Sequence, residues 1–257
     1  MSASALPMRI AEFKPVCWSC GLRKLCLPSG LSLEEIASLE RLVSGRRKVK
    51  CGHSLYRVDD PFGAVYAVWK GFFKSNVHLE DGREQVTGFH MPGDIIGTDG
   101  INTDRHCCNA IALKDSDVCI IQYAQLQVLL NELPRLQRQF HKLMSREIVR
   151  GQGAKVLLAS MYGDQRLAAF LLNLSERFAV TGHPPSQLHL CMSRLEIGSF
   201  LGLTFETVSR LFSKFHEEKL NSVDRRYIGI LDAAGLRKIL DGPSERRSAY
   251  YAIAPGN

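Results

Sequence analysis

Residues 193–219 read SRLEIGSFLGLTFETVSRLFSKFHEEK, and this stretch decides the fold of the last part of the chain. Ser193 with Glu196 three residues later forms a capping box, which predicts the start of a short helix. A turn with Gly202 follows, and Thr204 is placed to cap a second, longer helix. Two helices joined by such a short glycine-containing turn form a helix-turn-helix, in which the second helix enters the major groove of DNA.

The second helix, predicted over residues 205–219, has a polar face near its N-terminal end. Its outward positions there carry Glu206, Ser209 and Arg210. Arginine can bind the two acceptors of a guanine, glutamate can accept from a cytosine amine, and serine can contact a base or a phosphate. The alternative is that Glu206 and Arg210 form only a surface ion pair, worth roughly 0.3 kcal/mol. The inward positions are Val208, Leu211, Phe212 and Phe215.

A long helix is predicted upstream, from Pro134 to about residue 159, because apolar residues recur there at steps of three and four. A stripe this long exceeds what a small domain usually covers. Pairing with the same helix of a second subunit is therefore favoured, with packing inside the chain as the alternative. The stripe consists of Leu136, Phe140, Met144, Ile148, Gly151, Ala154 and Leu158. Further elements are expected as a helix over 164–178, a strand over 188–191 and a wing-like hairpin over 221–231.

The region from about residue 46 to residue 122 predicts a compact antiparallel barrel or sandwich. Short apolar runs such as 65–69, 86–90 and 118–121 are separated by turn residues, among them Pro92-Gly93-Asp94. Before this region, Ser32 and Glu35 form another capping box, which predicts a helix whose apolar face includes Val43.

Composition limits the classes of protein that fit this chain. Its 257 residues, 45% hydrophobic and 23% charged, suffice for two modest globular domains and contain no apolar run of membrane-spanning length. The first residues lack the features of a secretory signal, so a cytoplasmic location is expected. Thiols stay reduced in that compartment, and the eight cysteines are therefore interpreted as metal ligands or small buried residues. The net charge of +7 hints at a polyanionic partner but does not locate its site.

Three cysteines lie within ten residues, in the stretch CWSCGLRKLC that begins at Cys17 and ends at Cys26, with Cys20 between them. Thiolates are soft ligands that select zinc, cuprous copper or iron–sulfur clusters. The stretch is too short and irregular to bury a core, so these three cysteines predict an incomplete metal site. The spacing leaves the fourth ligand open among Cys51, Cys107, Cys108, Cys119 and Cys191.

Three motifs resemble the FNR branch of the CRP/FNR regulators and occur in the same chain order as in that family. Residues 206–210 are similar to its recognition-helix pattern E-T-x-S-R, residues 88–97 to G-F-H-x-x-G-D-x-x-G, and residues 166–170 to R-L-A-x-F. Together with the cysteines, the resemblance covers about residues 17–240. It implies an α+β fold with an N-terminal cyclic-nucleotide-binding-type antiparallel β-roll, a long dimerisation helix and a C-terminal winged helix-turn-helix. The expected boundaries are 1–30 for a cluster-binding arm, 31–130 for the β-roll, 131–160 for the helix, 161–245 for the DNA-binding domain and 246–257 for a tail.

The resemblance also implies a function. It selects Cys119 as the fourth ligand beside Cys17, Cys20 and Cys26, with a 4Fe-4S cluster that oxygen degrades. Zinc in a four-thiolate site is the competing assignment. The implied partners are double-stranded DNA, read by Glu206, Ser209 and Arg210 on a TTGAT-N4-ATCAA-like palindrome, a second copy of the chain in a homodimer, and RNA polymerase. Polymerase contact is expected around residues 80–83 and before Asn109. The remaining cysteines, Cys51, Cys107, Cys108 and Cys191, are expected to be small buried or half-buried thiols.

Two alternatives and three departures accompany this interpretation. A cyclic-nucleotide-responsive regulator is disfavoured, because Asp99 and the run from Arg105 to Ala110 lack the phosphate-binding Arg-Ser-Ala pattern of the CRP branch. An iron–sulfur redox protein would need a second cofactor motif, and the sequence has neither a Gly-rich phosphate loop nor a nucleophile elbow, which also argues against an enzyme.

The departures from the pattern of the FNR branch are Asp59 at a turn position that is commonly glycine, Phe205 before Glu206, and Gly151 with Gly153 in the dimer helix.

Overall fold

The computed structural model describes residues 17–241. The first sixteen residues of the predicted arm and the predicted tail, 246–257, lie outside the described residues. The structure separates into two compact units. Within the described residues, one is formed by residues 17–77 together with 87–143, and the other by residues 78–86 together with 144–241.

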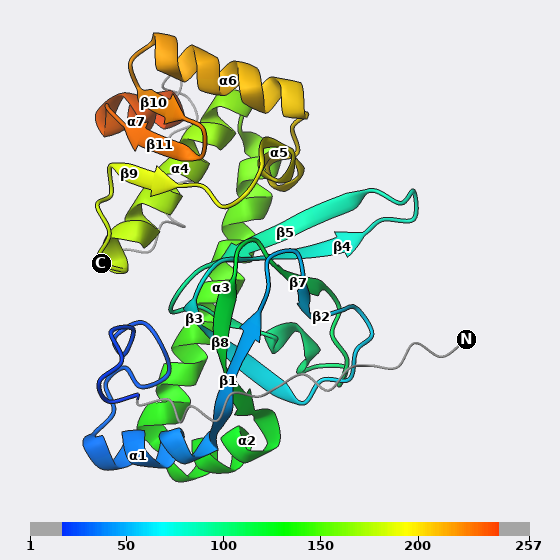
Figure 1. The fold of residues 1–257 in the computed structure, drawn as a ribbon, viewed down its shortest axis with the longest axis vertical. Helices are drawn as coiled ribbons and strands as arrows, with labels where there is room; N and C mark the ends of the chain where they lie inside the picture. Colours follow the sequence, from blue (N-terminus) through cyan, green and yellow to red (C-terminus); the bar gives the residue numbers. More distant parts are fainter. Residues whose placement is uncertain (1–16, 242–257) are drawn as a thin grey trace. The chain divides into compact units, whose positions relative to one another are not determined.

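The first unit contains two four-stranded sheets with antiparallel pairing (Figure 1). One has the order β1-β8-β3-β6 and the other β2-β7-β4-β5. Side chains such as Val68, Phe73 and Val118 fill a core between them, so the expected β-roll is confirmed. The strands are β1 (Val43–Val49), β2 (Ser54–Tyr56), β3 (Ala64–Lys70), β4 (Phe73–His78), β5 (Glu84–His90), β6 (Ile95–Ile96), β7 (Asn109–Ala112) and β8 (Ser116–Gln122).

Strand β1 begins earlier than the sequence indicated. Val43 was expected on the apolar face of the preceding helix, but that helix, α1 (Leu33–Leu42), ends one residue before it. Val43 is extended at φ −76° and ψ 100° and pairs with Ile121 on β8. A β-branched residue fits this pleated, buried position well. The capping box at the other end of α1 is confirmed, since the Glu35 amide donates to the Ser32 hydroxyl and the Ser32 amide donates to the Glu35 carboxylate.

Two further helices follow the barrel, α2 (Tyr123–Glu132) and α3 (Pro134–Ser160). The apolar stripe expected along α3 divides into two parts. Leu136 and Phe140 are buried, whereas Ile148 is 58% exposed and Leu158 is 38% exposed. Gly151, in the second part, has open space where a side chain would stand. Half of the stripe therefore packs within the chain, and the other half leaves apolar side chains in solvent.

The second unit contains the expected helix-turn-helix. Its three-stranded sheet has the order β10-β11-β9, and α5 and α6 both pack against α4 (Figure 1). The Ser193–Glu196 capping box and the Thr204 cap are confirmed. The predicted strand over 188–191 is shorter, because β9 ends at His189. The elements are α4 (Gly163–Val180), β9 (Gln187–His189), α5 (Arg194–Leu201), α6 (Phe205–Glu217), β10 (Asn221–Asp224), β11 (Tyr227–Ile230) and α7 (Ala233–Asp241). Within the described residues no helix is long and apolar enough to cross a membrane.

Two glycines shape the turn between α5 and α6. Gly202 ends α5 in the left-handed conformation at φ 62°, which glycine adopts without steric cost. The Gly198 carbonyl accepts from the amides of both Gly202 and Leu203. A Cβ added to Gly198 would lie 2.6 Å from the Leu203 carbonyl oxygen. The turn is therefore closed by backbone against backbone, with no room for a methyl group.

We expect Gly198→Ala to lower the free energy of unfolding by about 1–3 kcal/mol, because the new methyl group must push the backbone of the turn outward. Chemical denaturation with a fluorescence or circular dichroism readout measures this change. Gly151→Ala is the matched control, since its Cβ meets nothing within 4 Å in helix α3. There the same substitution should stabilise the protein by about 0.5–1 kcal/mol. Equal effects of the two substitutions would contradict the close approach at Gly198.

Candidate functional site

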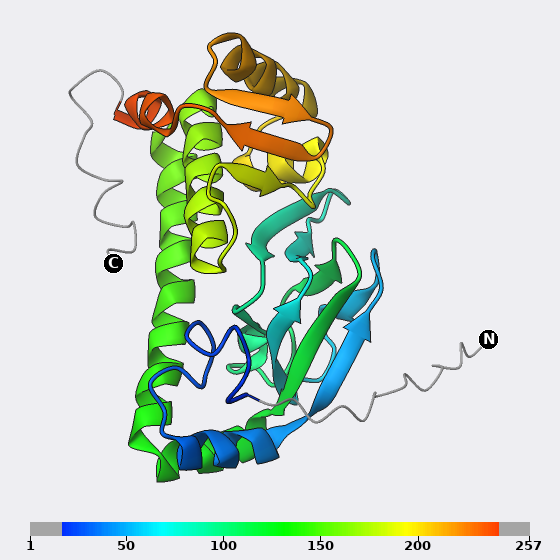
Figure 2. The same ribbon diagram turned by 60° about the vertical axis from the view of Figure 1, so that its left-hand side comes forward.

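The described part of the cysteine-rich arm is a chain of short turns held against two helices. The Cys20 amide donates to the Cys17 carbonyl, and the Cys26 amide donates to Leu22. The Trp18 amide donates to the Glu40 carboxylate on α1 over 3.1 Å. The Gln139 side-chain amide on α3 donates to the Cys26 carbonyl over 3.2 Å, and the arm lies beside α3 in Figure 2. The arm is therefore tied to both α1 and α3.

The four cysteines selected by the resemblance line a single cavity. Cys17, Cys20 and Cys26 enter it from the arm, and Cys119 enters it from strand β8. Strand β8 lies between β1 and β3, which places the Cys119 side chain on the sheet face that the arm covers. The other walls of the cavity are almost entirely apolar. They are formed by Leu22, Arg23, Leu27, Pro28, Leu39, Val43, Ala67, Val68, Trp69 and Ile121.

The donor set of this cavity fits a thiophilic metal group. Four sulfur ligands without a carboxylate or imidazole are the chemistry of zinc or an iron–sulfur cluster. An apolar lining limits the access of water and other ligands to such a group. As the side chains stand in residues 17–241, no three histidine, cysteine or acidic side chains converge closely enough to hold a metal ion. The cavity thus gathers the four thiols, and drawing the sulfurs to one centre requires further adjustment of the arm.

Burial favours the protonated form of Cys17, Cys26 and Cys119 when no cation is bound. Burial raises the pKa of Cys17 and of Cys26 to about 12, and it also raises the pKa of Cys119. A hydrogen bond from Arg46 acts in the opposite direction on the pKa of Cys119. Metal ligation needs thiolates, so binding at this site must release protons and becomes stronger as the pH rises toward these pKa values.

The four remaining cysteines do not all match the expectation of buried or half-buried thiols. Cys191 is buried and Cys108 is half-buried, as predicted. Cys51 and Cys107 are exposed, so the prediction is wrong for both. Cys51 belongs to the turn between β1 and β2, and Cys107 belongs to the loop before β7. Both side chains are exposed because they belong to turns and loops at the ends of strands, where no other element packs over them.

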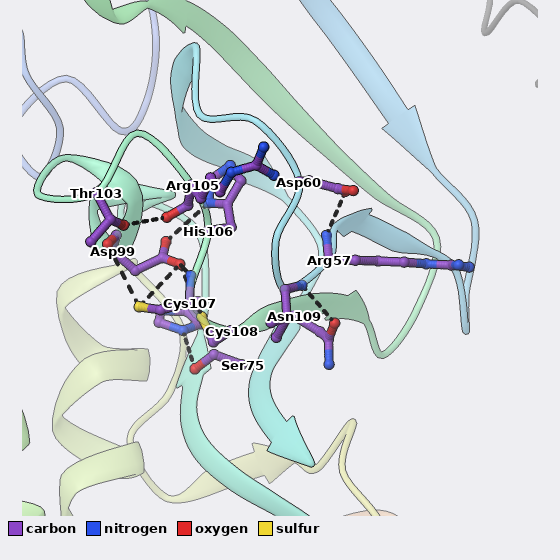
Figure 3. Close-up of polar contacts among 12 residues, drawn as sticks. Arg57, Asp60, Ser75, Asp99, Thr103, Arg105, His106, Cys107, Cys108 and Asn109 are labelled. Carbon is purple, nitrogen blue, oxygen red and sulfur yellow. Dashed lines mark hydrogen bonds and ion pairs between the residues drawn. The ribbon is translucent and has the colours of Figure 1, made fainter.

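A partly exposed polar cluster surrounds Asp99, which lies in the segment between β6 and β7 of the β-roll (Figure 3). The Asp99 carboxylate lies 2.9 Å from the Cys107 amide nitrogen, 3.4 Å from the Cys108 sulfur and 3.3 Å from Nδ1 of His106. His106 is buried and stacks on Tyr56 with ring centroids 3.7 Å apart. A carboxylate surrounded by its own donors repels a phosphate and already uses the polar groups that a cyclic nucleotide would need.

The turn at Asp59 agrees with the departure noted in the sequence. Asp59 has φ 67°, the left-handed conformation that aspartate tolerates better than most residues. The Arg105 guanidinium donates to the Asp59 carbonyl over 2.6 Å. Arg105 is therefore occupied in holding a turn of the β-roll.

The proposed DNA-reading residues lie near the N-terminal end of α6. Glu206 and Arg210 are exposed and Ser209 is half-buried, while Val208, Phe212 and Phe215 are buried as the spacing predicted. Arg210 donates from Nε to the Glu206 carbonyl over 3.4 Å. The pKa of Glu206 is lowered first by its own backbone amide and by Thr204, and Arg210 is a smaller cause. The helix thus presents both side chains to solvent from one face.

The hairpin turn between β4 and β5 is the first of the two expected polymerase-contact regions. Arg83 and Asp81 form an exposed ion pair at 2.6 Å, and the Leu79 amide donates to the Arg83 carbonyl. Backbone pairing gives this turn a defined shape, although exposed ion pairs of this kind contribute little to stability. The second region, the loop before Asn109, contains the exposed Cys107.

Two family models match the chain: the cyclic nucleotide-binding domain over residues 46–132 and the Crp-like helix-turn-helix domain over residues 165–239. A β-roll of this type, a long helix and a winged helix-turn-helix define a DNA-binding transcription regulator, a class without enzymatic activity. The chain belongs to the CRP/FNR superfamily, which includes the FNR-type regulators.

Named relatives and one solved structure support this assignment. The chain is 45% identical to the transcriptional regulatory protein Btr of Bordetella pertussis, over 87% of this chain and 93% of that protein. It is 42% identical to the transcriptional activator protein Anr of Pseudomonas aeruginosa, over 89% and 94% respectively. The structure of FixK2 from Bradyrhizobium japonicum is 30% identical with a TM-score of 0.71, over 77% of this chain and 98% of that one. The fold and the class expected from the sequence are confirmed.

Sequence reasoning missed three residues at the cysteine cavity. Gln139 holds the arm to α3, Trp69 lines the cavity, and Arg46 contacts Cys119 from the neighbouring strand. The last two contacts depend on the register of β1, β8 and β3, which no local pattern specifies. Gln139 is a polar residue that is 7% exposed on a predicted helix, and burial of that kind is visible only in the structure.

Proposed function

We propose that this chain is an oxygen-responsive transcription regulator of the FNR type. Cys17, Cys20, Cys26 and Cys119 hold a 4Fe-4S cluster, and a dimer with the cluster intact binds a TTGAT-N4-ATCAA-like palindrome. The observation that carries the proposal is the single apolar cavity onto which these four thiols open. When bound, the cluster supplies a centre that oxygen degrades.

The protein's own residues offer a route from the cavity to the dimer. The arm contacts α3 through Gln139, in the half of the helix whose apolar side chains are buried. The same helix continues to Ile148 and Leu158, which are exposed. We propose that an ordered arm fixes the first half of α3 and so favours the α3 position in which the exposed half pairs with a second copy. This is a shift between two populations, biased by whichever state holds the arm more tightly.

Contacts with DNA and with RNA polymerase complete the proposal. Glu206, Ser209 and Arg210 read the half-site from two recognition helices one DNA turn apart. The turn around Glu80 to Arg83 and the loop before Asn109 are proposed contacts with RNA polymerase. A cyclic-nucleotide response is disfavoured because the Asp99 carboxylate accepts from Cys107 and Cys108 of the β-roll and presents an acceptor that would repel a phosphate.

One experiment tests the proposal as a whole. The protein is purified without oxygen, its visible spectrum and its iron and sulfide content are recorded, and binding to the TTGAT-N4-ATCAA duplex is measured before and after air. A brown protein with about four irons and four sulfides per chain, whose DNA binding weakens in air, is the expected result. A colourless, zinc-loaded protein that binds DNA equally in both states would overturn the sensor function and leave the DNA-binding function standing.

Hydrophobic cover over the arm should control how fast oxygen degrades the cluster. Leu25 precedes Cys26 and lies against the turn at Gly93, where an added Cβ would stand 2.9 Å from the Leu25 Cβ. We expect Leu25→Asn to admit water to the cluster. The visible absorbance should then decay a few-fold faster in air. Leu33→Asn on α1, where the side chain is 67% exposed, is the control. Identical decay in both variants would rule out a role for this cover.

A further inference from the structure

Arg46 occupies a defined place beside the cysteine cavity. It lies on β1 directly opposite Cys119 on β8, and Cys119 in turn pairs with Ala67 on β3. Residues directly opposite each other on neighbouring strands point to the same face of the sheet, so the Arg46 side chain lies beside the Cys119 thiol. Its guanidinium carbon stands 3.7 Å from the centre of the Trp69 ring, and Trp69 itself lines the cavity. The arginine is therefore clamped between an aromatic face and a sulfur, with few free rotamers.

The negative charge of thiolates in the cavity would be stabilised by a nearby cation such as Arg46. Four thiolates facing one apolar space repel one another strongly, since the medium screens them weakly. Glu40 adds negative charge near Cys17, and Asp117 adds it near Cys119. Arg23 does line the cavity, but it directs its guanidinium to the Leu31 carbonyl over 3.2 Å.

We infer that Arg46 is a positioning residue for the fourth metal ligand: it aims the Cys119 sulfur into the cavity and offsets the charge of the four thiolates, so that the site closes on a thiophilic metal. The inference rests on the proposed function in one respect, namely that these four cysteines are the ligands. It adds a residue that touches no metal itself. Arginine suits this role because it is always charged and its planar group stacks on an aromatic ring while donating in its own plane.

Cobalt(II) tests the inference without the cluster. The metal-free full chain is titrated with Co²⁺ under reducing, oxygen-free conditions, and sulfur-to-cobalt charge-transfer absorption reports ligation by thiolates. We expect Arg46→Gln to bind Co²⁺ about ten-fold more weakly, in line with other residues that orient metal ligands. Arg46→Lys should recover part of the loss, because it restores the charge without the planar fork.

The adjacent arginine provides the matched control. Arg47 has the same charge and is also half-buried, but it pairs with Val118 and lies near Tyr66 and Asp60. Arg47→Gln should bind Co²⁺ as the parent protein does. Thermal unfolding of each metal-free variant confirms that the fold is retained. Equal weakening by Arg46→Gln and Arg47→Gln would overturn the inference, because a general disturbance of β1 would then explain both.

A second measurement uses the cluster where it can be assembled. Iron release into a chelator is followed for the anaerobically reconstituted parent and variants, and Arg46→Gln should lose iron several-fold faster. Unchanged Co²⁺ affinity and unchanged iron release in this variant would refute the role of Arg46 while leaving the proposed sensor intact. Conversely, a parent chain that binds Co²⁺ through thiolates and weakens on Arg46→Gln, yet never accepts iron and sulfide, would support the inference and refute the sensor.

Discussion

Cys119→Ser is expected to abolish cluster assembly and, with it, the difference in DNA binding between anaerobic and aerated protein. A serine hydroxyl is a hard, protonated group at neutral pH and cannot replace a thiolate toward iron. Cys119 is also the one ligand that comes from the barrel, so its loss leaves three ligands on the arm alone. The visible absorbance and bound iron should fall to background. Anaerobic affinity for the palindrome should fall at least ten-fold, to the value of the aerated parent.

The control for this substitution is another cysteine of the same chain. Cys191 is buried, with its sulfur 3.8 Å from Nδ1 of His189, and it lies far along the chain from the arm. Cys191→Ser should retain iron, colour and the response to air. Full iron content in Cys119→Ser would show that a different cysteine completes the site. Loss of iron in Cys191→Ser alone would have the same meaning.

Local sequence signals identified most of the fold. Capping boxes at Ser32 and Ser193 predicted two helix starts correctly. In each box the serine amide donates to a glutamate carboxylate only three residues later, so the signal is local in the sequence. The buried positions of the recognition helix were also predicted correctly, because the helical period determines which side chains face the core. The confirmed features are those in which residues close in sequence determine the structure.

The cysteine cavity depended on contacts that the sequence alone does not specify. Spacing left five cysteines open as a fourth ligand, and the resemblance to the FNR branch was needed to choose Cys119. Its neighbour Arg46 is distant in sequence and meets it only through the register of β1 and β8. The start of β1 at Val43, which overlaps the predicted end of α1, concealed that pairing. A one-residue shift in register would have turned Arg46 to the opposite face.

The half-exposed stripe on α3 explains why periodicity alone could not decide between intrachain packing and dimerisation. Leu136 and Phe140 pack inside the chain, as one interpretation predicts, whereas Ile148 and Leu158 are exposed, so pairing of that half with a second copy stays a prediction. An apolar stripe gives the direction of a helix face but not the identity of what covers it. The proposed dimer accounts for the exposed half without contradicting the buried half.

Arg210→Ala is expected to remove most of the base discrimination of the recognition helix. Arg210 is exposed on the face of α6 that also carries Glu206, and its Nε donates to the Glu206 backbone carbonyl over 3.4 Å. A bidentate arginine–guanine pair contributes about 1–3 kcal/mol of discrimination per half-site. Two half-sites in a dimer should therefore lose about 100-fold or more in affinity for the TTGAT-N4-ATCAA duplex.

Loss of base reading can be separated from loss of charge on the same helix. Lys214→Gln removes one positive charge from α6, but Lys214 lies 3.6 Å from the Asp164 carboxylate, away from the proposed reading face. Binding is measured at one fixed salt concentration, because phosphate contacts are strongly salt-dependent. The parent and Lys214→Gln should prefer TTGAT over a duplex in which the guanine of each half-site is replaced by adenine. Arg210→Ala should bind both duplexes with similar affinity, and a preserved preference for guanine in this variant would assign base reading to another residue of α6.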